Sequence, residues 1–279
     1  MPPPRRPGSG AAVEACSATA PDPLIVSSIA ETLLVHGRHL ILDAGQLAQD
    51  EDVLPTLPDQ PGIGGAILIL PPEPSAQLEA LRDRGFPFVV ADPRTPTPRD
   101  IPAVSAAHFA GARALTAHLA RLGHRHIGVP AGPHNWVAGS ARLPGHASAL
   151  ADPALVRSAE PTTEFGYRAA GELLDLPRRP TALVGFNDKA AVGALAAAAE
   201  RGLRVPADLS VTGFDDIDLA QATTPRLTTV RQPLEEMGRM AVSLLARLLE
   251  RHQLEALHVE LTPELVIRDS TGPVPPGAG

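Results

Sequence analysis

The sequence predicts an α/β protein that contains two doubly wound parallel sheets. Short apolar runs bounded by Gly, Pro or Asp recur along the chain, as in strands buried on both faces. Segments with apolar residues at three- and four-residue spacing, typical of helices, lie between these runs. The chain has 279 residues, of which 44% are hydrophobic, and this is enough material for two cores.

The expected strands are short, and most of them alternate with expected helices. The strands are expected at residues 12–16, 39–43, 65–70, 88–91, 103–105, 126–129, 155–158, 182–185, 209–213 and 264–268. The helices are expected at residues 24–36, 75–84, 107–122, 163–174, 189–201 and 233–252. A strand, a helix and a second strand in succession are typical of a parallel sheet, and here the pattern occurs in both halves of the chain.

Local signals place several of the helix ends. Asp22 and Pro23 stand where the first helix should begin, as capping and first-turn residues do. Gly123 and Gly202 follow two later helices, where glycine readily takes the left-handed backbone conformation that ends a helix. The last helix has one wide apolar stripe, which favours packing into a core.

Composition excludes several classes of protein. The net charge of −7 gives no broad basic face for nucleic acid. The single cysteine, Cys16, rules out an internal disulfide and a metal site built on thiolate pairs. No run approaches the roughly 18 apolar residues of a membrane span, and the first residues lack the apolar core of a secretory signal. We therefore expect a cytoplasmic protein without a membrane partner.

Polar residues follow two apolar strands in the second half of the chain. Asn187 and Asp188 come after one strand, and Asp215 and Asp216 come after the next. Ligands of open α/β sheets bind beyond the carboxyl ends of the strands. These side chains therefore predict a site for a small molecule.

The same part of the chain closely resembles the effector-binding domain of LacI-family transcription regulators. The resemblance rests on FND at 186–188, GLRVPADLSVTGFDD at 202–216, TTPRLTTVRQP at 223–233 and EEMGRMAVSLL at 235–245. It weakens upstream, at LGHRHIGVPAGP (122–133) and ARLPGHASAL (141–150), and covers about residues 11–271. It implies a periplasmic-binding-protein-like fold with two lobes and a ligand cleft between them.

The resemblance also implies how the chain is divided. Family members cross between the lobes three times, and the corresponding positions here are near residues 105–107, 230–232 and 259–261. The implied N-terminal lobe is 11–105 plus 231–259, the implied C-terminal lobe is 106–230 plus 260–271, and the Pro/Gly-rich ends 1–10 and 272–279 are expected to be disordered tails.

Three residues match effector contacts of the family. Asp215 matches the effector-contacting aspartate, Asn187 a pocket asparagine, and Arg142 the arginine that clamps the polar groups of the effector. Such groups make the paired hydrogen bonds that a sugar or nucleobase needs. Each has a structural alternative: a turn cap for Asp215, a turn-forming pair with Asp188 for Asn187, and a surface salt bridge for Arg142. We expect Asp188 to cap the following helix and Asp216 to be structural.

Two further residues complete the expected effector site. Asp92 ends the strand FPFVVAD and corresponds to a first-lobe aspartate that touches the effector in some members. Trp136, the only tryptophan, lies in the loop before the helix of Arg142, where its ring could stack on a sugar face. Packing of this ring on neighbouring loops is the alternative. Leu234 stands where some members have a cleft aromatic, which makes stacking from that position doubtful.

Other patterns do not indicate chemistry. His118, His124 and His126 cluster without a carboxylate, so we expect solvated histidines and no metal. The GIGG run at 62–65 precedes a strand, whereas a dinucleotide loop follows one. The sequence has no G-x-S-x-G, P-loop or H-E-x-x-H signature. We therefore expect neither an enzyme nor a cofactor.

The start of the chain departs from the family pattern. Members begin with a helix-turn-helix headpiece and a hinge helix, whereas residues 1–10 are too rich in proline for a recognition helix. We expect a homodimeric LacI-type regulator that senses a sugar or similar metabolite, and that binds operator DNA only if a headpiece is supplied. A free-standing sugar-binding protein of the same fold is the alternative, and an enzyme with an unrecognised site is a second one.

Overall fold

The computed structural model describes residues 12–17, 22–44, 53–71, 73–148 and 155–275, which form two compact units. Unit 1 contains the chain up to Ala106 and Pro233–Leu261, and unit 2 contains Ala107–Gln232 and the chain from Thr262 onward. The chain therefore passes between the units after residues 106, 232 and 261. The sequence-based division placed the same passages after residues 105, 230 and 259.

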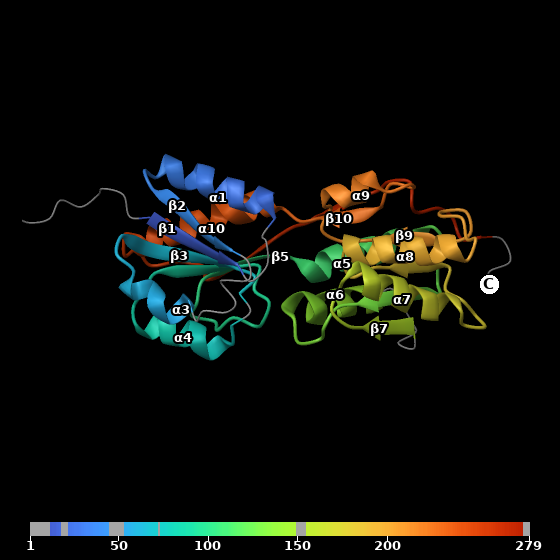
Figure 1. The fold of residues 1–279 in the computed structure, drawn as a ribbon, viewed down its shortest axis with the longest axis horizontal. Helices are drawn as coiled ribbons and strands as arrows, with labels where there is room; N and C mark the ends of the chain where they lie inside the picture. Colours follow the sequence, from blue (N-terminus) through green and yellow to red (C-terminus); the bar gives the residue numbers. More distant parts are fainter. Residues whose placement is uncertain (1–11, 18–21, 45–52, 72, 149–154, 276–279) are drawn as a thin grey trace, which may run out of the picture. The chain divides into compact units, whose positions relative to one another are not determined.

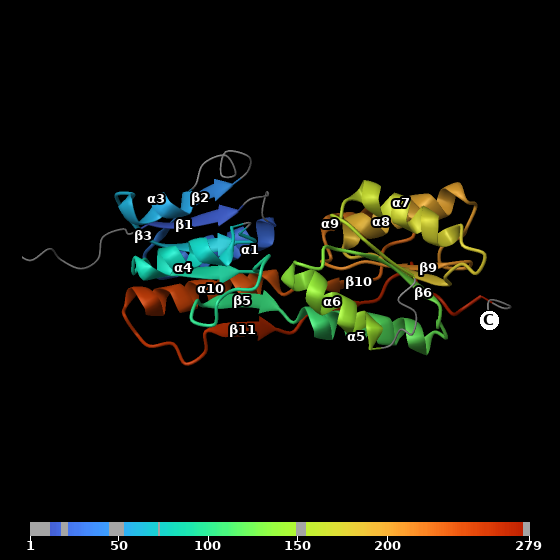
Figure 2. The same ribbon diagram turned by 90° about the horizontal axis from the view of Figure 1, so that it is seen from below.

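Unit 1 is built on a parallel sheet of six strands in the order β11-β5-β4-β3-β1-β2. These strands are β1 (Ala12–Ser17), β2 (His39–Ala44), β3 (Ile63–Ile69), β4 (Phe88–Ala91), β5 (Ala103–Ala106) and β11 (His258–Leu261). Strand β11 comes from a distant part of the chain and lies beside β5 at one edge of the sheet (Figure 2).

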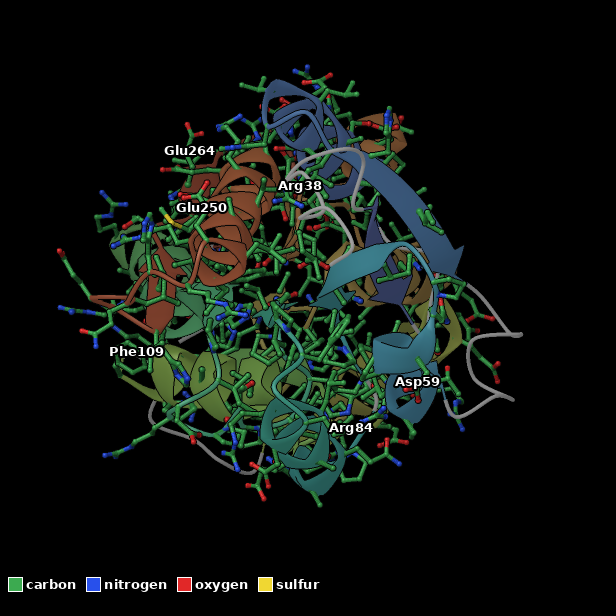
Figure 3. The ribbon with its side chains drawn as sticks, turned by 90° about the vertical axis from the view of Figure 1, so that its left-hand side faces the viewer. Arg38, Asp59, Arg84, Phe109, Glu250 and Glu264 are labelled. Atoms are coloured by element: carbon green, nitrogen blue, oxygen red, sulfur yellow. The ribbon has the colours of Figure 1, made fainter. Side chains whose placement is uncertain are left out.

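Helices cover both faces of this sheet (Figure 1). One face carries α1 (Pro23–Val35) and α10 (Leu234–Leu249), and the other carries α3 (Val53–Thr56), the short 3-10 helix η1 (Leu57–Asp59) and α4 (Ser75–Asp83). Successive side chains of a strand point to opposite faces. Accordingly, Ile67 of β3 packs with α1 and α10, whereas Leu68 packs with α3 and α4. On the α4 side, Arg84 pairs with Asp59 at 2.9 Å (Figure 3).

Unit 2 repeats this plan with a parallel sheet of four strands in the order β7-β6-β8-β9. The strands are β6 (Ile127–Ala131), β7 (Val156–Ser158), β8 (Ala182–Val184) and β9 (Ser210–Thr212), and the helices are α5 (His108–Arg121), α6 (Val137–Ala147), α7 (Thr163–Leu174), α8 (Asp188–Glu200) and α9 (Asp218–Ala222). Leu183 of β8 packs with α7 and α8, whereas Val184 packs with α5. The predicted α/β class with two parallel sheets is confirmed.

A short antiparallel pair in unit 2 departs from the prediction of parallel strands throughout. Strand β10 (Thr229–Arg231) pairs with β12 (Glu264–Val266). Strand β10 leads to the passage out of unit 2 after residue 232, and β12 follows the passage back after residue 261. The two strands therefore lie side by side and run in opposite directions.

Several predicted helix ends are confirmed. Helix α7 has the predicted bounds, and Asp22 caps α1 by accepting from the backbone N–H of Leu24 at 2.8 Å. Gly123 and Gly202 follow α5 and α8 with φ values of 97° and 67°, in the left-handed region that suits glycine. Helix α10 ends three residues earlier than predicted, at residue 249 instead of 252.

The C-terminal segment is fixed to unit 2 beyond the predicted start of the tail at residue 272. The N–H of Gly272 donates to Ser210 Oγ at 3.1 Å, and the N–H of Val274 donates to the carbonyl of Leu122 at 2.9 Å. The chain is thus ordered here because its backbone groups have partners. Of the expected tails 1–10 and 272–279, residues 1–10 and 276–279 lie outside the described residues. None of the described helices has both the length and the apolar character that crossing a membrane requires.

Candidate functional site

The centre of the candidate site is Arg142, which α6 carries into unit 2. This side chain is buried, with the whole residue 4% exposed, so the surface salt bridge considered from the sequence is wrong. Its Nη1 donates to the carbonyl oxygen of Phe186 at 2.7 Å. Phe186 lies just beyond the carboxyl end of β8, which places the guanidinium at the edge where open α/β sheets bind ligands.

Two aromatic rings hold the guanidinium of Arg142. Its Cζ lies 3.6 Å from the centroid of the Phe214 ring and 4.6 Å from that of Phe186. A guanidinium stacks favourably on an aromatic face because the ring presents negative charge there. The buried ring of His108, from the first turn of α5, lies 6.0 Å from Phe214. These contacts fix the plane of the cation.

Asp215 lies beside Arg142 in the loop after β9. Its Oδ1 accepts from Arg142 Nη2 at 3.3 Å and from Gln232 Nε2 at 2.8 Å. Its backbone has a φ of 113°, which is strained for a residue other than glycine, and its N–H donates to the carbonyl of Val230 at 2.8 Å. The predicted pair Asp215 and Arg142 is therefore brought into direct contact.

Gln232 has one hydrogen-bonding group left over in this arrangement. The residue is 8% exposed, and its Nε2 is used by Asp215. Its Oε1 is buried and finds no donor among the residues that the structure describes. Leaving such an acceptor without a donor costs about 1–3 kcal/mol. Because this oxygen has almost no exposed surface, a ligand hydroxyl or amine could supply the missing hydrogen bond only if the Gln232 side chain turned toward it.

Asn187 is the cap of α8. Its Oδ1 accepts from the N–H of Ala190 at 2.8 Å, and its Nδ2 donates to the carbonyl of Pro161 at 3.2 Å. The prediction that Asp188 would be this cap is wrong. The backbone of Asn187 is extended while Asp188 is already helical, and a cap side chain must come from the extended residue. An effector contact from Asn187 stays a prediction.

The carboxylate of Asp188 instead points into unit 2, where it is fully buried. It accepts from Thr229 Oγ1 at 2.5 Å and from the N–H of Ile217 at 2.9 Å. Burial, together with the nearby charge of Asp215, raises the pKa of Asp188 to about 7. A Cβ on Gly213 would lie 2.2 Å from Asp188 Oδ1, so only glycine fits at that position.

The other two predicted site residues, Trp136 and Asp92, lie in different units. Trp136 precedes α6, and its partly exposed ring meets the ring of Phe186 edge-on, with centroids 6.3 Å apart. Asp92 belongs to unit 1, where it follows β4 with a φ of 51° and donates its N–H to the carbonyl of Val104 at 2.7 Å. Effector contacts from these two residues stay predictions.

The histidine cluster corrects another expectation. His118 and His124 are buried, not solvated, and burial lowers the pKa of both. His124 contacts Thr181 Oγ1 at 2.9 Å and the carbonyl of Gly272 at 3.0 Å, and His118 contacts Thr271 Oγ1 at 3.1 Å. These two rings thus fasten the C-terminal segment. Within the described ranges, no three His, Cys, Asp or Glu residues gather in a way that could hold a metal ion.

Sequence reasoning did not single out four residues of the site. These are His108, Phe186, Phe214 and Gln232. Phe186 and Phe214 each directly precede one of the predicted polar residues, at the carboxyl end of a strand. Their position was a usable signal, because strand ends line the same edge of the sheet. Gln232 is the last residue of the segment Ala107–Gln232, and nothing in its local sequence indicates that it faces Asp215.

Comparisons with known proteins agree with this architecture. Residues 116–271 match the family model described as a periplasmic binding protein-like domain. The chain is 41% identical over 206 residues to an uncharacterized HTH-type transcriptional regulator of Streptomyces limosus, covering 71% of this chain but only 58% of that relative. It is 34% identical over 259 residues to the HTH-type transcriptional repressor CytR of Escherichia coli K12, covering 90% and 75% of the two chains.

Solved structures are similar over nearly the whole chain. A regulatory protein of the LacI family from Chloroflexus aggregans superposes with a TM-score of 0.85 at 30% identity, covering 94% of this chain and 98% of the other. The transcriptional regulator CelR, solved as a complex with cellobiose, superposes with a TM-score of 0.84 at 28% identity, covering 93% and 84%. These proteins are regulators, not enzymes.

Proposed function

This chain belongs to the LacI family of transcription regulators and contains the effector-binding region of that family, and on this premise we propose that unit 2 binds a small sugar or similar hydroxyl-rich metabolite. The observation that carries the proposal is the convergence of Arg142, Asp215 and Gln232 at the carboxyl edge of the sheet, with Gln232 Oε1 lacking a donor.

Sugar hydroxyls suit these three groups because each hydroxyl can donate and accept. A hydroxyl could donate to Gln232 Oε1 or to the partly exposed carboxylate of Asp215, and accept from the fixed guanidinium of Arg142. Hydrogen bonds to charged groups contribute about 1.5–3 kcal/mol each. Trp136 supplies a partly exposed ring for an apolar sugar face. The similarity to CelR, which was solved with cellobiose, supports the sugar class.

We infer that the bound metabolite controls transcription by shifting a conformational equilibrium. A ligand that binds one conformation more tightly moves the population toward it, with coupling free energies of about 1–3 kcal/mol. The matched relatives are HTH-type regulators. Because the net charge of −7 gives this chain no broad basic face, operator DNA would be contacted only through such a helix-turn-helix headpiece.

We also propose that the protein is a homodimer. Unit 1 exposes large apolar side chains at the end of α1, where Leu34 and Val35 are exposed, and on the edge strand β2, where Ile41 and Leu42 are exposed. Large exposed apolar side chains are often buried at protein–protein interfaces. Sedimentation equilibrium of the Leu34→Glu variant tests this proposal: the variant should be monomeric at a concentration at which the parent is dimeric.

Calorimetric titration with a defined panel tests the binding proposal. The panel contains glucose, galactose, ribose, maltose, cellobiose, cytidine and adenosine. We expect at least one sugar to bind, and Arg142→Ala and Asp215→Ala to weaken that binding at least tenfold. Asp269→Ala is the matched control, because Asp269 forms an exposed pair with Arg226 at 2.8 Å in the same unit. Unchanged affinity in both site variants would refute the site.

A further inference from the structure

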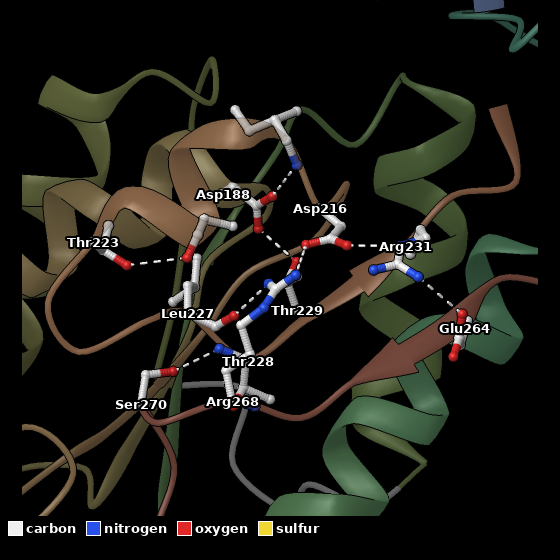
Figure 4. A network of polar contacts seen from close by, with 12 residues as sticks. Asp188, Asp216, Thr223, Leu227, Thr228, Thr229, Arg231, Glu264, Arg268 and Ser270 are labelled. Atoms are coloured by element: carbon white, nitrogen blue, oxygen red, sulfur yellow. Dashed lines mark hydrogen bonds and ion pairs between the residues drawn. The ribbon is translucent and has the colours of Figure 1, made fainter. Parts of the chain in front are cut away.

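Asp216, the neighbour of the proposed effector contact Asp215, is held by two arginines. Its side chain is 2% exposed. Its Oδ2 accepts from Arg231 Nε at 2.8 Å, and its Oδ1 accepts from Arg268 Nη2 at 2.5 Å. Arg231 in turn reaches Glu264 Oε2 with its Nη1 at 3.3 Å (Figure 4).

The partners of Asp216 lie where the chain leaves and re-enters unit 2. Arg231 ends β10, and the chain leaves the unit after the next residue, Gln232. Glu264 begins β12, shortly after the chain returns at Thr262. Arg231 and Glu264 are register partners in this antiparallel pair. One carboxylate in the site loop is therefore connected to both of these passages.

The loop that carries Asp215 depends on such contacts. Asp215 and Asp216 have φ values of 113° and 59°, so two consecutive residues other than glycine adopt left-handed conformations. Strained conformations of this kind persist only where the surrounding structure holds them. The N–H of Asp215 is bonded to Val230, but the side chain of Asp216 provides the charged anchor of the turn.

The two ends of the network differ in character. The Asp216–Arg268 pair is buried, and Arg268 is fixed further because its Nη1 donates to the carbonyl of Leu227 at 2.8 Å. Glu264 is 70% exposed, and exposed pairs such as Arg231–Glu264 contribute little to stability. The inner pair can thus hold the loop in place, while the outer pair can break and re-form at low free-energy cost.

We propose that Asp216 is a positioning residue that couples Asp215 to the two segments by which the chain leaves and re-enters unit 2. This inference rests on the proposed function in one respect, that Asp215 contacts the effector. Within the network, a ligand that displaces Asp215 also moves the backbone of Asp216, and the Arg231 side chain transmits that displacement to β10 and β12. Asp216 need not touch the ligand.

Hydrogen exchange and NMR on the ligand-free protein test the coupling. In Asp216→Asn, we expect the amide of Asp215 and the side-chain amide of Gln232, which donates to Asp215, to exchange at least tenfold faster. Backbone amides within α7 and α8 should keep the exchange rates of the parent. Asp269→Asn is the control, since it removes a carboxylate from an exposed pair with an arginine in the same unit. In this control the exchange rates of the two reporter groups, the Asp215 amide and the Gln232 side-chain amide, should be unchanged.

Two results would overturn the inference. One is unchanged exchange at both reporters in folded Asp216→Asn, and the other is a uniform rise throughout unit 2, which indicates a role in stability alone. If Asp216→Asn does not fold, Arg231→Lys decides the question. Arg231 is half-exposed, and lysine lacks the planar fork with which the guanidinium bonds both carboxylates. We expect at least threefold faster exchange at the two reporters, and no change would refute the coupling.

These readouts do not need a ligand, so they separate this inference from the proposed function. If no sugar in the panel binds but the exchange results are as expected, the coupling stands and the effector class fails. If cellobiose or another sugar binds the parent and Asp216→Asn leaves both the exchange rates and the affinity unchanged, the coupling fails and the proposed function stands.

Discussion

The guanidinium of Arg142 lies over the ring of Phe214, with 3.6 Å between the guanidinium carbon and the ring centroid. Phe214 is fully buried and directly precedes Asp215, which accepts from the same guanidinium. One short segment thus supplies both the face that orients the cation and the carboxylate that pairs with it. The position of Arg142 is therefore set by packing as much as by charge.

Replacing Arg142 with lysine tests this interpretation. Lysine keeps the charge but lacks the planar fork that bonds Phe186 and Asp215 while stacking on the rings. We expect Arg142→Lys to lower the free energy of unfolding by about 1.5–3 kcal/mol, the range for hydrogen bonds to charged groups, and to weaken binding of the sugar found in the panel at least tenfold. Urea denaturation and calorimetry measure the two effects. Arg113→Lys, on the exposed side of α5, is the control.

The buried carboxyl of Asp188 should make the stability depend on pH. Its pKa is raised to about 7 in the folded protein from an ordinary value of 3.8, so the folded state binds the proton more tightly. This contribution to stability is complete below pH 3.8 and is lost as the pH rises toward 7, at no more than about 1.4 kcal/mol per pH unit.

Asp188→Asn should remove that pH dependence between about pH 4 and pH 7, and denaturation at several pH values measures it. Asp218→Asn, at the exposed start of α9, is the control and should keep the slope of the parent. The assignment is wrong if the slopes of Asp188→Asn and the parent coincide.

His146 should have the opposite effect on stability. Burial, together with the positive charge of Arg142, lowers the pKa of His146 from 6.5 to about 3. Because the unfolded chain binds the proton more readily, this contribution is complete above pH 6.5 and is lost as the pH falls toward 3. His146→Gln should therefore be less sensitive to acid than the parent. His252→Gln, at an exposed position after α10, should unfold with the acid sensitivity of the parent.

The parts of the fold that were predictable from the sequence are those that local chemistry decides. Helix α7 has the predicted bounds because Thr162 caps it, accepting from the N–H of Phe165 at 3.0 Å, and its apolar face is continuous. The antiparallel pairing of β10 with β12 was not predictable from local pattern. It depends on where the chain enters and leaves unit 2, which is a property of the whole fold.

In the site, too, some residues could be predicted from the sequence and others could not. Asp215 could be singled out because it follows the end of an apolar strand, and Arg142 because it matches the arginine that clamps the effector in the resembled family. The aromatic faces that orient them were missed, although their position at strand ends was a signal, because an apolar residue after a strand is usually interpreted as core. That Asn187 and not Asp188 caps α8 follows from a single backbone step that the sequence does not determine.

Asn187 offers a decisive comparison between a capping role and a ligand-binding role. Asn187→Ala removes the acceptor for the N–H of Ala190 and should lower the free energy of unfolding by about 0.5–2 kcal/mol, the range for lost helix caps. Asn187→Asp keeps the cap and adds a negative charge near a helix N-terminus, so its stability should stay close to that of the parent. It loses only the donor to Pro161.

If Asn187 also contacts the effector through its amide, Asn187→Asp should weaken sugar binding while leaving the free energy of unfolding nearly unchanged. Equal affinity in Asn187→Asp and the parent, measured by calorimetry, would assign this residue to the cap alone.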